Sequence, residues 1–331
     1  MGLPHVARLF FKSVNREAKI KRKYIVHLVV KIIVKSTNTQ ISNNMDTDKT
    51  TIDNNVNDVE NQEQNNQFAP YPNLRQSWVI FGFFLLFSLG VSLLIYPLSL
   101  IEFDSINEWV NLLSYVVSFV LLFYYIKFKM RNMGQSINLD FKKAPILVFF
   151  LLLPIAPLLI IVLEPITSGI PTPEFFEELL KDMVKVSPAS FLSVVIAAPL
   201  CEEIICRGII LKGLLNNKMN PTNAIMCSSL IFATLHLNLT QGVNAFFIGC
   251  FMGWMYYKTR SLWVPIFIHF LNNGLAFLLL FLSSNPDLTT EELVGANNYT
   301  TIYYATFILL GLLIYALYRY FVSCKVLDVK R

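Results

Sequence analysis

Three groups of polar side chains interrupt apolar stretches of the chain, and their residue types can do chemistry. The groups are Glu202, Glu203 and Arg207, then His236, then His269 and Asn273. Ionisable residues within apolar, membrane-embedded helices are rare and usually functional. Glutamate and histidine can move protons or bind a metal, and an asparagine amide can donate to an oxyanion. These six side chains are therefore the candidate catalytic set.

The spacing of the first group predicts how its charges are balanced. Glu203 and Arg207 are four residues apart, so they share one helical face and can form an ion pair. Glu202 is turned by about 100° from Glu203 on a helix with 3.6 residues per turn. One arginine compensates one carboxylate, so the other needs a proton or another positive group. The histidines His236 and His269 are the candidates for that group.

Two mechanisms fit these residues. In the first, Glu202, His236 and His269 bind a divalent metal such as zinc, with water in the open position. In the second, Glu202 is a general base that deprotonates water, while a histidine and Asn273 stabilise the oxyanion. Either mechanism hydrolyses an amide. The sequence has no Gly-x-Ser-x-Gly or His-Glu-x-x-His motif, which argues against serine-hydrolase and zincin chemistry.

The composition of the 331-residue chain places these side chains in a membrane. Hydrophobic residues make up 54% and charged residues 15%, compared with about 25% charged residues in ordinary soluble domains. The mean hydropathy is +0.52. These values exclude a soluble enzyme, a disordered protein and a nucleic-acid-binding protein. The lipid bilayer is the expected surrounding, and a peptide or protein at the membrane is the expected substrate.

Eight apolar segments follow Trp78, and each approaches or exceeds the length of a membrane-spanning helix. The segments are 78–101, 108–127, 144–163, 189–214, 223–238, 240–257, 263–283 and 301–322. The fifth and sixth are short, and their connection at Asn238–Thr240 is tight. In the sixth, Gly249 and Gly253 are one turn apart, which predicts close helix packing. The sequence thus predicts an all-α, polytopic membrane protein with about eight transmembrane helices.

The charges of the connections alternate between acidic and basic along the chain. Basic connections lie on the cytoplasmic side of a membrane, so the alternation predicts eight spans with both termini cytoplasmic. We expect the protein in a bacterial inner membrane. The basic residues of three connections and the C-terminus are Lys127, Lys129, Arg131, Lys142 and Lys143, then Lys212 and Lys218, then Lys258 and Arg260, then Arg319, Lys325, Lys330 and Arg331.

Four parts are predicted along the chain. Residues 1–76 form a leader, basic and then polar, that we expect to be largely disordered, with a native start hypothesised at Met45. The second part, 77–185, contains the N-terminal transmembrane helices and then an amphipathic segment. The third part, 186–285, is the catalytic core, and the fourth, 286–331, is an outer loop followed by the last helix. Five scattered cysteines without a CxxC pair indicate neither a disulfide framework nor a thiolate zinc site.

The distance of each polar residue from the cytoplasmic end of its helix gives a partial check on whether the polar groups meet. Glu202 and Glu203 lie roughly 9–12 Å, and His269 about 9 Å, from the predicted cytoplasmic ends of their helices at about 1.5 Å per residue. His236 lies near 20 Å on the same rule. A meeting of all four side chains therefore requires a tilted or re-entrant fifth helix.

In order and spacing, the three motifs Glu-Glu-x-x-x-Arg-Gly, Phe-x-x-x-His and His-x-x-x-Asn resemble those of the CPBP intramembrane proteases. That family includes the type II CAAX prenyl endopeptidases and bacterial bacteriocin-processing or Abi-type proteins. The matching positions are Glu202, Glu203 and Arg207; Phe232 and His236; His269 and Asn273. The resemblance covers about residues 185–285.

The resemblance implies a proteolytic site buried in the membrane. It makes Glu202 the activator of water and Glu203 with Arg207 a supporting pair, and it leaves open whether a metal takes part. A rival from another class is a non-proteolytic immunity or regulatory protein of the same family. A proton-coupled transporter is a third reading, disfavoured because no repeated pair of broken helices is visible.

Overall fold

All described residues lie in one compact unit, Phe68–Arg331. The computed structural model describes residues 69–99, 104–170, 186–283 and 289–323. Most of the predicted leader, including the start hypothesised at Met45, lies outside these residues, as does nearly all of the amphipathic segment.

Every described regular element is a helix, which confirms the all-α class. The elements are α3 (Leu74–Ser99), α4 (Asp104–Asn132), α5 (Ile146–Ser168), α7 (Pro188–Phe191), η1 (Leu192–Ala197), α8 (Ala198–Glu203), η2 (Ile204–Leu211), α9 (Lys212–Asn216), α10 (Pro221–Thr234), α11 (Leu239–Thr259), α12 (Trp263–Ser283), α13 (Thr290–Val294) and α14 (Ala296–Ser323). The run from α7 to α9 is continuous and is called the acid-bearing rod below. Each of the eight apolar segments coincides with a helix or with this rod.

Five of the described helices are long and apolar enough to cross a membrane: α3, α4, α5, α12 and α14. The chain is accordingly an integral membrane protein. Helix α10 has 14 residues, a length of about 21 Å at 1.5 Å per residue, which is shorter than a hydrocarbon core of about 30 Å. The count of eight spans therefore stays a prediction. The cytoplasmic location of both termini also stays a prediction.

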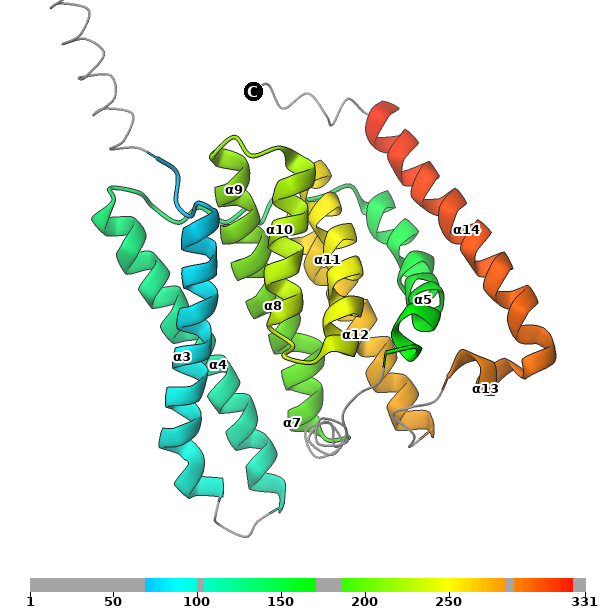
Figure 1. The fold of residues 1–331 in the computed structure, drawn as a ribbon, viewed down its shortest axis with the longest axis horizontal. Helices are drawn as coiled ribbons and strands as arrows, with labels where there is room; N and C mark the ends of the chain where they lie inside the picture. The colour runs from blue at the N-terminus through cyan, green and yellow to red at the C-terminus, as the bar shows by residue number, and fades with distance from the viewer. Residues whose placement is uncertain (1–68, 100–103, 171–185, 284–288, 324–331) are drawn as a thin grey trace, which may run out of the picture. The chain divides into compact units, whose positions relative to one another are not determined.

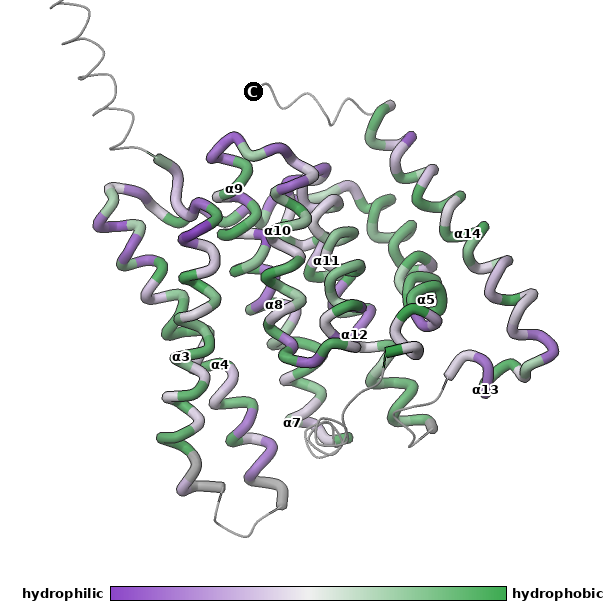
Figure 2. The backbone as a smooth tube through the Cα atoms, viewed as in Figure 1, coloured by the Kyte–Doolittle hydropathy of each residue, from purple (hydrophilic) through white to green (hydrophobic). Residues whose placement is uncertain are grey.

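Figure 1 shows the acid-bearing rod grouped with α10, α11 and α12, with α3 and α4 on one side and α5 and α14 on the other. The contacts agree: α10 packs against α11 and η2, α12 against α8 and α5, and α4 against α7 and η1. Hydrophobic residues run along most of the long helices in Figure 2, whereas hydrophilic residues gather in connections such as that between α9 and α10.

Two clusters of buried apolar side chains meet at the acid-bearing rod. The first joins the rod to α3, α4 and α10 through residues such as Ile126, Leu211 and Leu214. The second includes Cys206 of the rod and joins it to α5, α11, α12 and α14 through residues such as Leu152. The rod is thus fixed from both sides, which limits the freedom of the acids that it carries.

The residues directly before α3 are held in place by side chains from distant parts of the chain. Tyr71 is 5% exposed, and its backbone N–H donates to Oε1 of Gln135 at 3.0 Å. The Asn217 amide donates to the carbonyl oxygens of Pro70 at 2.7 Å and Pro72 at 3.2 Å. Two side-chain amides thus bond to the proline-rich backbone that leads into α3.

The far end of the rod is clamped by a buried carboxylate. Asp140 accepts from the Tyr256 hydroxyl at 2.8 Å and pairs with Lys212 Nζ at 3.0 Å. The lysine also donates to the Asn138 carbonyl at 2.8 Å. This clamp joins the connection before α5 to both α9 and α11, and it sets the position of the rod along its axis.

Candidate active site

Local sequence explains why the rod is not a regular α-helix at the two glutamates. Ser187 caps its start by accepting from the Ser190 N–H at 3.1 Å. The flanking stretches η1 and η2 are π-helical, a geometry found frequently at functional sites. Pro199 has no N–H to donate, and the N–H of Ala198 bonds to Ser193, five residues back. Glu202 and Glu203 therefore lie on the short helix α8 between two wider π-helical stretches, η1 and η2. Their positions around the helix axis are shifted from those on a continuous α-helix.

The predicted ion pair between Glu203 and Arg207 is confirmed. Arg207 Nη1 donates to Glu203 Oε1 at 2.7 Å, and neither side chain has exposed area. Arg207 Nη2 donates to the Gly249 carbonyl at 3.1 Å, and the guanidinium carbon lies 4.5 Å from the centroid of the Phe232 ring. One arginine thus ties the rod to both α10 and α11, and its charge is compensated by one carboxylate and one aromatic face.

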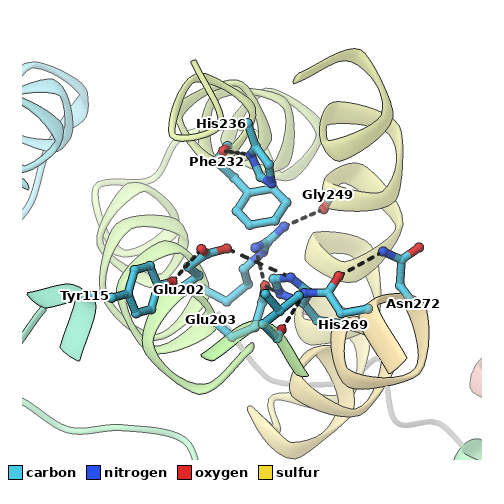
Figure 3. A network of polar contacts seen from close by, with 11 residues as sticks. Tyr115, Glu202, Glu203, Phe232, His236, Gly249, His269 and Asn272 are labelled. Carbon is cyan, nitrogen blue, oxygen red and sulfur yellow. Dashed lines mark hydrogen bonds and ion pairs between the residues drawn. The ribbon is translucent and has the colours of Figure 1, made fainter. Parts of the chain in front are cut away.

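His269 lies against both glutamates (Figure 3). Its Nδ1 is 3.1 Å from Glu203 Oε1, and its Nε2 is 3.9 Å from Glu202 Oε2. The imidazole is only 4% exposed. Helix α12 therefore brings a titratable ring to the acids of α8, as the depth comparison from the sequence required.

Glu202 receives a hydrogen bond from a residue that the sequence analysis did not single out. The Tyr115 hydroxyl, from α4, donates to Glu202 Oε1 at 2.7 Å. Among the described residues, no hydrogen-bond partner reaches the buried Oε2 of Glu202. The chain has 14 tyrosines and nothing in the motif spacing marks this one, so only the packing of α4 against the rod could reveal it.

His236 is placed by the end of α10 rather than inside a helix. The fifth apolar segment was predicted to reach residue 238, but α10 ends at Thr234. Leu237 has a φ of 52°, which a continuing helix does not allow. Asn238 accepts from the Gln241 N–H at 3.2 Å and caps α11. The tight connection between α10 and α11 is therefore confirmed, with α10 capped at Leu235 and α11 starting from the Asn238 cap.

The two imidazoles meet the same aromatic ring. His236 and His269 pack edge-on against Phe232, with centroid distances of 5.3 Å and 5.5 Å, as Figure 3 shows. His236 Nδ1 lies 3.2 Å from the Phe232 carbonyl oxygen. Within the described residues, no hydrogen bond or ion pair joins His236 to Glu202. The two imidazoles thus share Phe232 as a neighbour, and the meeting of His236 with Glu202 stays a prediction.

Asn273 fixes the position of α12 on the rod. Its Nδ2 donates to the Val194 carbonyl in η1 at 2.9 Å, and its Oδ1 accepts from the Asn272 amide at 3.1 Å. Since the π-helical η1 follows a different hydrogen-bonding pattern from an α-helix, a side chain of α12 can bond to one of its carbonyls. In this arrangement Asn273 contacts the backbone of the rod, and no hydrogen bond joins it to either glutamate in the described part of the chain.

The predicted metal ligands do not fit a metal ion as they are arranged. Among the described residues, no three His, Cys, Asp or Glu side chains gather as a group of ligands. Only two of the three predicted ligands, Glu202 and His269, are adjacent, and the aromatic ring of Phe232 meets both imidazoles. The reaction proposed for this site therefore uses only its side chains and water.

An apolar cavity of about 340 Å³ is lined by residues of the acid-bearing rod and of α12, with neither glutamate nor His269 in its lining. The rod contributes Val195, Pro199 and Leu200 to its lining, and α12 contributes Ile266 and Phe270. Pro199 precedes Glu202 by three residues and Phe270 follows His269 directly. The cavity and the polar cluster are thus built from the same two elements.

Comparison with known proteins bears on the segment that carries these residues. Residues 185–275 match the family model described as Type II CAAX prenyl endopeptidase Rce1-like. A Bacillus subtilis (strain 168) protein named "Putative membrane peptidase YdiL" is 31% identical over 102 residues, which cover 31% of this chain and 41% of the relative. No solved structure matches the chain. The resemblance to the CPBP intramembrane proteases is therefore confirmed across residues 185–275, the segment that holds all three motifs.

Proposed function

We propose that the chain is an intramembrane endopeptidase that hydrolyses a peptide bond with water activated by Glu202. One observation carries the proposal: Glu202 Oε2 is buried without a hydrogen-bond partner among the described residues and faces His269 Nε2 at 3.9 Å. A carboxylate oxygen and an imidazole nitrogen at this separation can both contact one water molecule. Both residues lie in the segment that matches an endopeptidase family.

The proposed reaction begins with proton transfer from water to Glu202 Oε2. The hydroxide adds to the carbonyl carbon of the scissile bond, and the N–H of an imidazolium donates to the oxyanion that forms. His269 is the nearest donor, and His236 is the second candidate on the other side of Phe232. When the tetrahedral intermediate collapses, the C–N bond breaks and the proton held by Glu202 passes to the leaving amine.

Glu203 and Arg207 hold the imidazole in position in this proposal. The Glu203 carboxylate touches His269 Nδ1 at 3.1 Å, so Nε2 is directed toward Glu202. Orientation of an imidazole by a carboxylate on its other nitrogen is a recurring arrangement in hydrolases. Arg207 in turn holds the Glu203 carboxylate in place through their fully buried contact at 2.7 Å. Asn273 keeps α12 at this height by its bond to Val194.

The apolar cavity indicates the class of substrate. Its lining is apolar, and it adjoins the elements that carry Glu202 and His269. We propose a peptide or protein substrate at the membrane with an apolar group near the scissile bond, in keeping with the CAAX prenyl endopeptidases that the segment resembles. Cleavage of an internally quenched peptide carrying S-farnesylcysteine, compared with the same peptide carrying free cysteine, measures the contribution of that group.

The proposed location is a bacterial inner membrane, crossed eight times with both termini cytoplasmic. The alternation of basic and acidic connections supports this topology, and five helices already meet the length and hydropathy needed. A green fluorescent protein fused to the C-terminus should fluoresce. Activity of alkaline phosphatase fused at the same position would contradict the topology.

Peptidase activity can be tested before the substrate is identified. Membranes from bacterial hosts producing the wild-type protein or Glu202→Ala are compared by mass spectrometry of new peptide termini. We expect cleaved membrane-associated proteins with the wild type alone. Identical termini in both samples, at equal protein levels, would favour the rival function of a non-proteolytic immunity or regulatory protein.

A further inference from the structure

The bond between Tyr115 and Glu202 joins the candidate site to a helix outside the matched family segment. Tyr115 lies on α4 (Asp104–Asn132), whereas the match begins at residue 185. Its hydroxyl is 2.7 Å from Glu202 Oε1, at the usual distance of an O–H···O hydrogen bond. The two residues are 87 positions apart in the chain, so the contact depends on how α4 packs on the rod.

The tyrosine ring is itself held in place by aromatic packing. It lies 4.9 Å from the ring of Phe119, centroid to centroid, and Phe119 lies 4.7 Å from Phe84 of α3. Tyr115 also packs against the first core cluster, together with Cys201 next to the acid. A hydroxyl on a ring that is fixed in this way holds its acceptor in one orientation.

The two oxygens of the Glu202 carboxylate therefore have different surroundings. Oε1 accepts from Tyr115, and Oε2 is directed toward His269 Nε2. Turning the carboxylate out of its plane would break the tyrosine bond, so the bond on one oxygen holds the other oxygen toward the imidazole. We infer that Tyr115 is a positioning residue of the peptidase, which presents Glu202 Oε2 to the water that is activated. This inference rests on the proposed function of Glu202.

A structural role alone makes a different prediction from a positioning role. Hydrogen bonds between membrane helices stabilise their packing, and losing one that is only structural would lower stability without changing turnover per folded molecule. A positioning role lowers kcat and leaves KM unchanged, because substrate binding does not involve the hydroxyl. Tyr125 provides a matched control, since it lies on the same helix and stacks on Phe83 at 4.0 Å, away from the acids.

The test compares wild type, Tyr115→Phe, Tyr125→Phe and Glu202→Gln in lipid nanodiscs, with the quenched farnesylated peptide as probe. We expect Tyr115→Phe to lower kcat about 10- to 100-fold with an unchanged KM, and Tyr125→Phe to behave as wild type. In the Glu202→Gln background, Tyr115→Phe should cause little further loss, because the two residues act as a unit. Wild-type kcat in Tyr115→Phe, with Glu202→Gln inactive, would overturn the inference and leave the proposed function standing. Wild-type rates in Glu202→Gln would overturn both.

A second readout does not depend on the probe being cleaved. Infrared difference spectra between wild type and Glu202→Gln identify the carboxylate bands of Glu202. Tyr115→Phe should shift these bands, because one oxygen loses its donor, and Tyr125→Phe should not. Unshifted bands in Tyr115→Phe would contradict the positioning of Glu202 by this tyrosine, whatever the substrate is.

Discussion

The Nδ1 of His269 lies 3.1 Å from Oε1 of Glu203, and both side chains are buried. The same oxygen accepts from Arg207 at 2.7 Å. The second glutamate is therefore more than a partner for an arginine one turn away: it joins the charge on the rod to an imidazole on α12. Its carboxylate determines which nitrogen of that imidazole faces Glu202.

Glu203→Gln should destabilise the protein more than the same change at the neighbouring acid. The substitution leaves the buried Arg207 without its counter-charge, and breaking a buried ion pair costs about 3–5 kcal/mol. Glu202→Gln breaks no ion pair with an arginine or lysine among the described residues. Thermal unfolding in detergent, followed by circular dichroism, measures the difference. Equal midpoints for the two variants would show that the buried pair does not contribute as described.

Gly249→Ala should disturb both packing and the arginine. A methyl group there would lie 3.2 Å from Arg207 Nη2, from Phe232 Cδ1 and from Ser229 Cβ. Overpacking of this kind costs about 1–3 kcal/mol. Gly82→Ala on α3 is the control, because no atom lies within 4 Å of the added methyl. We expect a lower unfolding midpoint for Gly249→Ala alone; a midpoint equal to that of Gly82→Ala would refute the close approach of α10 and α11.

The two histidines should both be needed for cleavage but differ in their effect on folding. His269→Ala removes a buried bond to Glu203, so we expect loss of cleavage together with reduced stability. His236 is only partly buried and bonds to the backbone of its own turn, so His236→Ala should lose cleavage and keep the wild-type unfolding midpoint. Retained turnover in both variants would be incompatible with the site assignment.

Removal of metal should leave the rate unchanged if Glu202 activates water directly. The described residues hold no group of three metal-binding side chains, and the proposed proton transfer uses only the carboxylate. The purified protein is treated with 1,10-phenanthroline, its metal content is measured by mass spectrometry, and cleavage is assayed before and after. A rate lost with the metal and restored by zinc would support the metal mechanism with Glu202, His236 and His269 as ligands.

The sequence predicted the helices and much of the cluster from local rules. Eight apolar segments marked the helical elements, because apolar length is a property of neighbouring residues. Spacing predicted the bond of Glu203 with Arg207, since positions i and i+4 share a face. The two glycines of α11 predicted close packing, which is found at Gly249 and at Gly253, where an added methyl would lie 3.1 Å from Ile225.

Features that depend on packing between distant segments could not be predicted in this way. The π-helical turns shift the acids off a 3.6-residue register, α10 ends at Thr234 before it reaches His236, and the Tyr115 hydroxyl belongs to a residue 87 positions from Glu202. The hold of Gln135 and Asn217 on the residues directly before α3 has the same origin. In each case the feature depends on a residue that is distant in the sequence, or it has no repeating sequence pattern that would predict it.

The most direct test of the account is the turnover of Glu202→Gln on the quenched farnesylated peptide in nanodiscs. The substitution keeps an oxygen that can accept from Tyr115 and removes the base that takes a proton from water. The account predicts that kcat falls by about 10²- to 10⁴-fold, the range expected for loss of a general base, while the unfolding midpoint stays close to that of the wild type. Turnover equal to the wild type would contradict it.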